Sequence, residues 1–239
     1  MKKFLLHLLA LTFLFPLSAF GECVEGNCVD GQGTFLFPDG TRYVGLFKNS
    51  AFNGEGVITY PDGTRYKGQF RDGMFHGKGK EVTPDGTRYV GEFSNGKFSG
   101  EGEITYPDGT RYRGEFKNNK FNGTGTLFYA DGHKYQGEFV DGKFNGRGTM
   151  TFPDGSRYVG EFKDNEFNGH GEMTYRSGGK YVGEFRNNLP NGYGKAIFSD
   201  GTEYEGAMKD GVPHGYGTMT LPDGSVQEGE FKKGAFVGE

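Results

Sequence analysis

The sequence predicts an all-β fold of about nine β-hairpins in series. Three observations carry this prediction. One pattern recurs every 23 residues, as from Tyr43 to Tyr66; large and small residues alternate within it with a period of two; and it contains a Pro-Asp-Gly turn. A fixed period of this length is typical of proteins that stack one small structural unit. Nothing in the repeats has helical periodicity.

The composition agrees with a folded repeat. Glycine supplies 45 of 239 residues and aromatic residues supply 16%, with 24 Phe and no Trp. Disordered chains are poor in aromatic residues, so this composition does not indicate disorder. Aliphatic residues are too scarce for a conventional core, so the sequence predicts packing between aromatic rings and glycines.

The alternation is clearest in a Tyr-x-Gly-x-Phe motif, as in Tyr66, Gly68 and Phe70. A ninth copy has Gln227 at the tyrosine position but keeps Phe231. The motif has no insertion or deletion between copies, so one register is expected along the repeats. Its tyrosines are Tyr43, Tyr66, Tyr89, Tyr112, Tyr135, Tyr158, Tyr181 and Tyr204.

The turn predicts how each unit folds. In Pro61-Asp62-Gly63, proline presets its own φ, aspartate suits the third turn position, and glycine adopts a positive φ. This is a type I turn followed by a glycine bulge, a common hairpin connection. Residues 57–60 and 64–70 alternate with a period of two and favour strands.

Each unit therefore reads as one hairpin, from 31–47 to 215–231, which gives eighteen strands. The segments between hairpins, such as 71–76, are turn-rich and carry one aromatic residue. The last units depart from the pattern, because Pro190 and Pro213 replace the aromatic residue of this segment. They are expected to act as capping repeats or to form a partner interface.

Alternation also assigns the two faces of the sheet. Tyr66 and Phe70 point to one face, whereas Arg65 and Lys67 point to the other. An uncovered aromatic stripe would exceed the apolar area that a soluble monomer normally exposes. Either the aromatic residues of the connecting segments cover it, or it is a groove for a partner. The candidate binding residues are Tyr66, Phe70, Tyr89, Phe93, Tyr112, Phe116, Tyr135, Phe139, Tyr158 and Phe162.

The stretch Tyr89–Gly102, YVGEFSNGKFSGEG, resembles the MORN (membrane occupation and recognition nexus) repeat. The resemblance covers residues 31–239, and it implies an elongated, single-layer, twisted antiparallel sheet of stacked hairpins. Family members include membrane-tethering junction proteins, cytoskeletal scaffolds, and enzymes whose catalysis lies in another domain. The resemblance therefore implies a scaffold, with dimerisation through terminal repeats as a further possibility. The family's phospholipid binding belongs to basic members, unlike this chain.

Residues 1–21 resemble a secretory signal peptide, with Lys2 and Lys3 before an apolar run from Phe4 to Phe15. The alternative is a retained anchor, although the run is short for a membrane span. The sequence thus predicts export to the periplasm or cell envelope, or secretion. Residues 22–30 are expected to form a cap segment before the repeats. In an oxidising compartment, its Cys23 and Cys28 are expected to close a local disulfide. An intermolecular bond or a metal site is the alternative.

No catalytic set, cofactor site or metal site is predicted. Aspartates in neighbouring turns would lie about 9–10 Å apart, too far to share one calcium ion. Removal of residues 1–21 takes away two lysines and leaves 25 basic and 31 acidic residues, a net charge of −6. This negative charge disfavours nucleic acid as a partner. The turn aspartates are Asp39, Asp62, Asp85, Asp108, Asp131, Asp154, Asp200 and Asp223. The scattered histidines are His76, His133, His170 and His214.

The sequence therefore predicts a non-catalytic interaction scaffold. It would bind a protein partner or a membrane surface through the aromatic face. A module that binds lipid or glycan in repeated aromatic slots is the alternative, and multiple weak sites would add through avidity. An enzyme is the third reading, and no sequence feature supports it.

Overall fold

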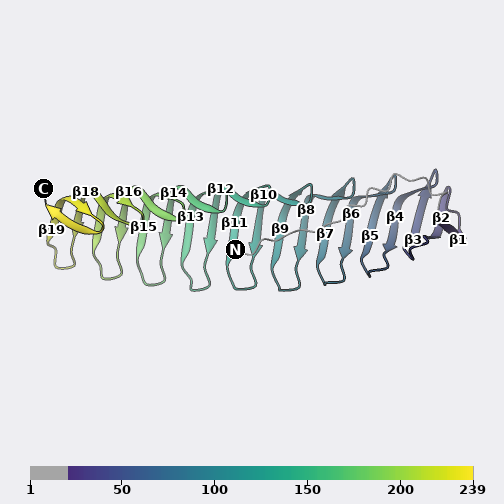
Figure 1. Ribbon diagram of the computed structural model, residues 1–239, viewed down its shortest axis with the longest axis horizontal. Coiled ribbons are helices and arrows are strands. Elements are labelled where there is room, and N and C mark those ends of the chain that lie inside the picture. The colour runs from purple at the N-terminus through teal and green to yellow at the C-terminus, as the bar shows by residue number, and fades with distance from the viewer. Residues whose placement is uncertain (1–20, 239) are drawn as a thin grey trace. The chain divides into compact units, whose positions relative to one another are not determined.

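The computed structural model describes residues 21–238, which form twenty strands and no helix. The chain forms two compact units that meet in the sequence between Asn122 and Gly123. In each unit, strands consecutive in sequence pair with one another, always antiparallel, and form a row of hairpins (Figure 1). The predicted all-β fold of stacked hairpins is confirmed. The predicted signal peptide lies outside the described residues, apart from Gly21.

In the first unit, strands of seven and nine residues alternate after two shorter strands. Strand β10 (Lys120–Phe128) contains the sequence boundary between the units. The strands before it are β1 (Glu22–Gly26), β2 (Gly31–Leu36), β3 (Arg42–Lys48), β4 (Ala51–Thr59), β5 (Arg65–Arg71), β6 (Met74–Val82), β7 (Arg88–Ser94), β8 (Lys97–Thr105) and β9 (Arg111–Lys117).

The second unit continues the same alternation. Its altered repeats keep the register, because Pro190 pairs with Phe185 and Pro213 pairs with Met208. The strands after β10 are β11 (Lys134–Val140), β12 (Lys143–Thr151), β13 (Arg157–Lys163), β14 (Glu166–Thr174), β15 (Lys180–Arg186), β16 (Leu189–Ile197), β17 (Glu203–Lys209), β18 (Val212–Thr220), β19 (Val226–Lys232) and β20 (Ala235–Gly238).

The predicted hairpins correspond to β2–β19, and the two further strands lie at the ends. Strand β1 pairs with β2, and β20 pairs with β19. Each covers backbone groups that would otherwise form an unpaired sheet edge. Because neither strand carries the repeat motif, the periodicity did not reveal them.

Five-residue connections, here called long turns, follow each even-numbered strand from β2 to β18. In Tyr60–Thr64, the Gly63 N–H donates to the Tyr60 carbonyl at 2.9 Å, and Gly63 has a φ of 91°. The Thr64 N–H donates to Asp62 Oδ1 at 2.7 Å. The predicted turn chemistry is therefore present, and aspartate holds the backbone where the next strand begins.

Two-residue connections, here called short turns, follow the odd-numbered strands from β3 onward. Asp72 and Gly73 have φ values of 49° and 80°. Positive φ at both central residues indicates a type I′ turn, which suits tight hairpins. Strand β6 consequently begins at Met74, so Phe75 belongs to a strand, and the turn-rich segment expected at 71–76 contains only a two-residue turn.

Every nine-residue strand within the units contains a bulge. Between β5 and β6, Gly68 pairs with Gly79 and Phe70 pairs with Phe75, so β6 inserts two more residues than β5 over the same interval. Gly77, in the insertion, has a φ of 60°. A bulge bends the strand that carries it. The bend directs Phe75 toward the tyrosine-bearing face of the sheet, where it stacks on Tyr66.

Candidate functional site

The ten aromatic side chains predicted to bind a partner lie in the core. Their exposed fractions are between 0% and 4%. Side chains this inaccessible pack against their neighbours and offer no surface for contact. The contact role that the sequence suggested is therefore replaced by a packing role. These residues are Tyr66, Phe70, Tyr89, Phe93, Tyr112, Phe116, Tyr135, Phe139, Tyr158 and Phe162.

Rings from the bulged strands cover this face. Phe75 stacks on Tyr66 with ring centroids 3.8 Å apart and planes 7° apart, and Phe93 meets Tyr66 edge-on at 4.9 Å. The Tyr66 hydroxyl donates to the Gln69 carbonyl at 2.7 Å. We call this repeated set of Tyr, Phe and stacked Phe the aromatic ladder. Edge-on and offset-stacked pairs contribute about 0.5–1.5 kcal/mol beyond their burial.

Glycines make room for the ladder. A Cβ built on Gly79 would lie 2.5 Å from Cε2 of Tyr66, and one built on Gly68 would lie 2.5 Å from the Cα of Gly79. The large-small-large alternation thus places each tyrosine ring over a glycine of its own strand and one of the next strand. Burial raises the pKa of the Tyr66 phenol, so the ladder is uncharged at physiological pH.

A second row of rings occupies the first position of the long turns and remains partly accessible. Tyr60 lies two residues after the buried Ile58, so it continues the core face to the turn edge. Tyr175 and Phe198 are 40% and 38% exposed, and the other rings are half-buried. We call this set the turn ring row. It comprises Phe37, Tyr60 and Tyr106 in the first unit, and Tyr129, Phe152, Tyr175 and Phe198 in the second.

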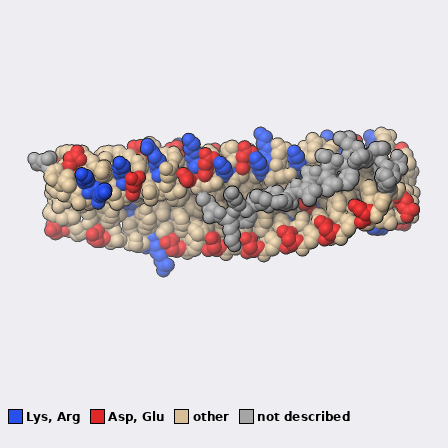
Figure 2. All heavy atoms as spheres, in the orientation of Figure 1, with Lys and Arg blue, Asp and Glu red and all other residues tan. Residues whose placement is uncertain are grey.

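The edge that carries the turn ring row is acidic. Figure 2 shows acidic side chains along the long-turn edge of each unit. Each turn aspartate accepts a backbone N–H two residues later at 2.7–3.1 Å. The pKa of Asp85 is lowered, first by a hydrogen bond from the Thr83 hydroxyl and then by one from the Thr87 N–H. The long turns therefore place carboxylates beside the rings along this edge.

The repeat that contains β6 departs from the others at the end of that strand. Glu81 is only 8% exposed, and its backbone pairs with Tyr66 and Tyr89. Burial raises the pKa of Glu81 to about 7. Two residues later, Thr83 stands where neighbouring turns have Tyr60 and Tyr106. The residues equivalent to Glu81 are all apolar, namely Phe35, Ile58, Ile104, Leu127, Met150, Met173, Ala196 and Met219.

Sequence reasoning missed Glu81, although one signal could have revealed it. Aligned by the 23-residue period, this position holds one charged residue among nine. The alternation assigns it to the core face, and an unpaired carboxylate on that face is costly. Comparison of the copies position by position would therefore have singled it out.

The opposite face carries other accessible features in the second unit. Tyr193 and Tyr216 are 59% and 61% exposed, and their hydroxyls donate to Glu205 and Glu228 at 3.4 Å. A shallow polar depression lies on the same sheet. Its lining residues are Lys134, Gln136, Thr149, Thr151 and Arg157. These are solvated surface groups without a buried, unpaired polar atom among them.

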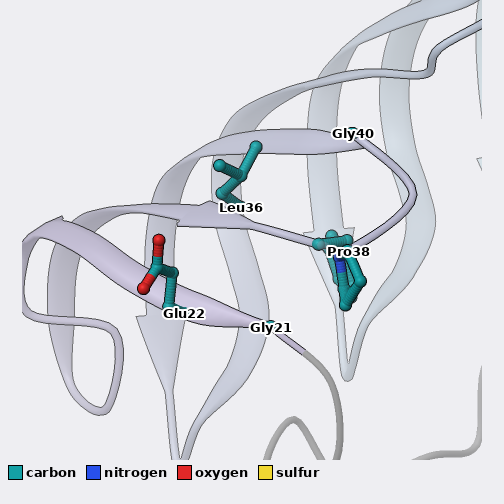
Figure 3. A pocket seen from close by; sticks show the side chains of 6 residues that line it. Gly21, Glu22, Leu36, Pro38 and Gly40 are labelled. Carbon is teal, nitrogen blue, oxygen red and sulfur yellow. The ribbon is translucent and has the colours of Figure 1, made fainter.

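The N-terminal segment pairs with the first repeat. Cys23 and Cys28 are joined by a disulfide, and Cys23 lies in β1, which pairs with β2. A shallow depression lies between β1 and the first long turn (Figure 3). Gly21, Glu22, Leu36, Phe37, Pro38 and Gly40 line it. Among the described lining residues, Glu22 is the one that is charged, and none of the others has a polar side chain with which to orient a ligand.

The described residues show no arrangement typical of metal catalysis. Within residues 21–238, no three His, Cys, Asp or Glu side chains cluster closely enough to hold a metal ion. His133 Nδ1 instead contacts Asp131 Oδ1 at 2.9 Å in its own turn. The same part of the chain contains no helix long and apolar enough to cross a membrane.

The repeat geometry agrees with a known family. The MORN repeat profile matches nine consecutive segments, at 30–42, 43–65, 66–88, 89–111, 112–134, 135–157, 158–180, 181–203 and 204–226. The chain belongs to the MORN-repeat family. A matched MORN copy such as 66–88 contains most of β5, a short turn, β6 and a long turn. The family pattern thus begins at the ladder tyrosine, and the turn ring row lies toward the end of each copy.

No curated protein matches the chain. One similar solved structure is the TCP domain of SAS-4 (dCPAP) of Drosophila melanogaster in complex with a proline-rich motif of Ana2. It is 14% identical to this chain, and the match covers 72% of this chain and 87% of that domain, with a TM-score of 0.39. The G-box domain of the microcephaly protein CPAP is 17% identical and covers 89% and 99%, with a TM-score of 0.40. Both TM-scores are below 0.5, so the likeness says nothing about partners of this MORN chain.

Proposed function

We propose that this chain is a non-catalytic MORN-repeat scaffold, exported to the cell envelope or secreted, that binds a protein partner through the turn ring row. The observation that carries the proposal is the contrast in exposure between the two sets of rings. The aromatic ladder is buried, whereas Tyr175 and Phe198 of the turn ring row are 40% and 38% exposed. Export rests on the pattern of residues 1–21.

The chemistry of the turn ring row suits a protein interface. Burial is the main cause that raises the pKa of Tyr60 and of Tyr106 to about 12, so both phenols are neutral at physiological pH. Tyrosine offers a large apolar ring with a hydrogen-bonding hydroxyl and few rotatable bonds. Aromatic residues are therefore enriched at protein interfaces and at their energetic centres.

The acidic long-turn edge favours a protein over a membrane or a nucleic acid. Asp39, Asp62, Asp85 and Asp108 line this edge in the first unit. Their charge repels anionic lipid headgroups and nucleic-acid phosphates. A neutral membrane, a glycan and a second copy of this chain remain as outcomes that the experiment must separate.

Site-specific photo-crosslinking in the native host tests the proposal on the full chain. A photoreactive phenylalanine analogue replaces Phe152 or Tyr175 of the turn ring row, and Val182, 44% exposed, is the control position. We expect both ring positions to capture the same protein and the control position not to capture it. Equal capture from all three positions would overturn the assignment of the surface.

Two further measurements separate the alternatives. Adducts of twice the chain mass would indicate a homodimer. Co-sedimentation with neutral or anionic liposomes that persists at physiological salt would indicate that the partner is a membrane surface. Retention on cell-wall glycan would indicate that it is a carbohydrate. N-terminal sequencing of protein recovered from the envelope or medium tests export, because the expected mature chain begins after Ala19 or Gly21.

A further inference from the structure

The turn ring row of the first unit is interrupted at Thr83. Consecutive long turns lie side by side: a Cβ built on Gly63 would be 3.9 Å from Cγ of Pro84, and one built on Gly86 would be 3.9 Å from Cγ of Pro107. The turn that begins at Thr83 therefore lies between those that carry Tyr60 and Tyr106. A threonine there removes one ring from the row, directly beside the strand position of Glu81.

The donors around Glu81 are already engaged. The hydroxyl of Tyr66 donates to the Gln69 carbonyl at 2.7 Å, and that of Tyr89 donates to the Glu92 carbonyl at 2.8 Å. The Thr83 hydroxyl donates to Asp85 Oδ1 at 2.5 Å and lies 3.2 Å from the Thr87 carbonyl oxygen.

The carboxylate of Glu81 itself has no hydrogen-bond or ion-pair partner among residues 21–238. The titratable groups that interact with it are the phenols of Tyr60, Tyr66 and Tyr89, and none of them is a cation. More than nine-tenths of the Glu81 residue surface is buried. The carboxylate oxygens keep some contact with solvent, because neither is among the enclosed side-chain atoms without a partner in the described residues. A poorly solvated carboxylate is costly to charge, and a cation that approached it would lower that cost.

We infer that Glu81, together with Tyr60 and Tyr106, forms a site for one primary ammonium group, supplied by a lysine side chain of a protein partner. The carboxylate would accept a charge-assisted hydrogen bond from the ammonium, and the two rings would flank the cation and its apolar stem. Asp85 and Asp108 on the same edge would attract a positive charge over longer distances.

The acidic edge also selects the source of the ammonium. The ethanolamine headgroup of a lipid carries a phosphate close to its ammonium, and Asp62, Asp85 and Asp108 would repel that phosphate. A lysine side chain brings four methylene groups and no anion. This assignment deepens the proposed function and rests on it, because the lysine belongs to the proposed partner.

Carbon-13 NMR of the Glu81 carboxyl in the purified protein tests the site without any partner. The probe is n-butylammonium chloride, compared with sodium chloride at equal concentration. We expect butylammonium to lower the pKa of Glu81 by about one unit, because an ion pair favours the charged form. The matched variant is Thr83→Tyr, which restores the ring that neighbouring turns carry and keeps Glu81. This variant is expected to lose the shift while keeping the circular dichroism spectrum of the parent.

No shift in the parent protein, or an equal shift in Thr83→Tyr, would overturn the site. Photo-crosslinking from the turn ring row then shows whether the proposed function survives without it. If the shift is present, partner capture that weakens in Glu81→Gln supports the lysine. A shift without any captured protein would overturn both the proposed function and the lysine as its source. Glu81-dependent binding to phosphatidylethanolamine vesicles, but not to phosphatidylcholine vesicles, would assign the ammonium to a lipid instead.

Discussion

The aromatic ladder and the turn ring row use the same residue types and the same period, yet only one of them is accessible. Tyr66 is fully buried, because Phe75 stacks on one face of its ring and two glycines lie under the other. Tyr175 is 40% exposed because it begins a long turn, beyond the last paired residues of its strand. Coverage by neighbouring strands, rather than residue type, decides whether a ring stabilises the sheet or meets solvent.

This difference implies a division of labour along each repeat. Ladder rings such as Tyr66 contact several other rings, so their loss removes packing on several sides. Rings of the turn ring row are covered on fewer sides, so their loss should cost less stability and, under the proposed function, more binding. Variants that affect stability and binding to different degrees therefore test the distinction.

Replacement of a ladder ring should have the largest effect. Phe98 is 1% exposed and stacks on Tyr89 with ring centroids 3.7 Å apart. Phe98→Ala is expected to lower the free energy of unfolding by about 3–5 kcal/mol, the range for a buried phenylalanine. The control is Tyr60→Ala in the turn ring row, which should cost less than half as much. Urea unfolding followed by circular dichroism measures both, and equal losses would contradict the division.

The repeat with Glu81 has a carboxyl on the core face and lacks a ring in the turn ring row. The contribution of this carboxyl to the free energy of unfolding should depend on pH. Burial raises its pKa from 4.5 to about 7. The folded state therefore binds this proton more tightly than the unfolded state does. The stability that Glu81 contributes is fully present below pH 4.5 and is lost as the pH rises through about 7. The difference amounts to about 3 kcal/mol.

Glu81→Ile, which copies Ile58 of the preceding repeat, removes this titration. The stability of the variant relative to the parent should increase by about 3 kcal/mol between pH 4 and pH 8. Urea unfolding at the two pH values measures the increase. Glu101→Gln is the control, because Glu101 is exposed and its replacement should leave the pH dependence unchanged. Parallel pH profiles for parent and Glu81→Ile would show that the Glu81 carboxyl is not titrating as a buried group.

The fold could be predicted because its local signals agree with one another. The period, the alternation at Tyr66-x-Gly68-x-Phe70 and the Pro61-Asp62-Gly63 turn all specify stacked hairpins, and the structure has them. The bulge at Gly77 could not be predicted from alternation alone, because a period-two reading assumes an uninterrupted strand. That bulge carries Phe75 onto Tyr66.

The site was harder to predict for the same reason. Without the bulge, the face that bears Tyr66 and Phe70 reads as an open aromatic stripe, and the rings of the long turns read as ordinary strand ends. Exposure depends on which rings the bent strands cover, and this is a property of packing between strands. Glu81 lay within reach of sequence reasoning, because its charge contradicts the face that alternation assigns to it.

A smaller effect is expected where the ladder meets the backbone. A Cβ on Gly102 would lie 2.5 Å from the Tyr89 hydroxyl and 2.8 Å from its Cε2. Gly102→Ala should therefore lower the free energy of unfolding by about 1–3 kcal/mol, as overpacked cores do. The adjacent Glu101→Ala on the exposed face is the matched control and should be nearly neutral. If both variants unfold at the same urea concentration, the ring does not need the glycine.

The smallest effect is expected in the long turns that hold the ring row at the edge. Asp62 accepts the Thr64 N–H at 2.7 Å and the Thr64 hydroxyl at 3.0 Å. Asp62→Ala should cost about 1 kcal/mol in urea unfolding, the usual contribution of such a bond. The seventh long turn has Ser177 at this position, before Gly179. Ser177→Asp supplies the missing acceptor and should recover part of that amount in the second unit. A loss from Asp62→Ala without a gain from Ser177→Asp would mean that the flanking strands, rather than the turn aspartate, position the rings at this edge.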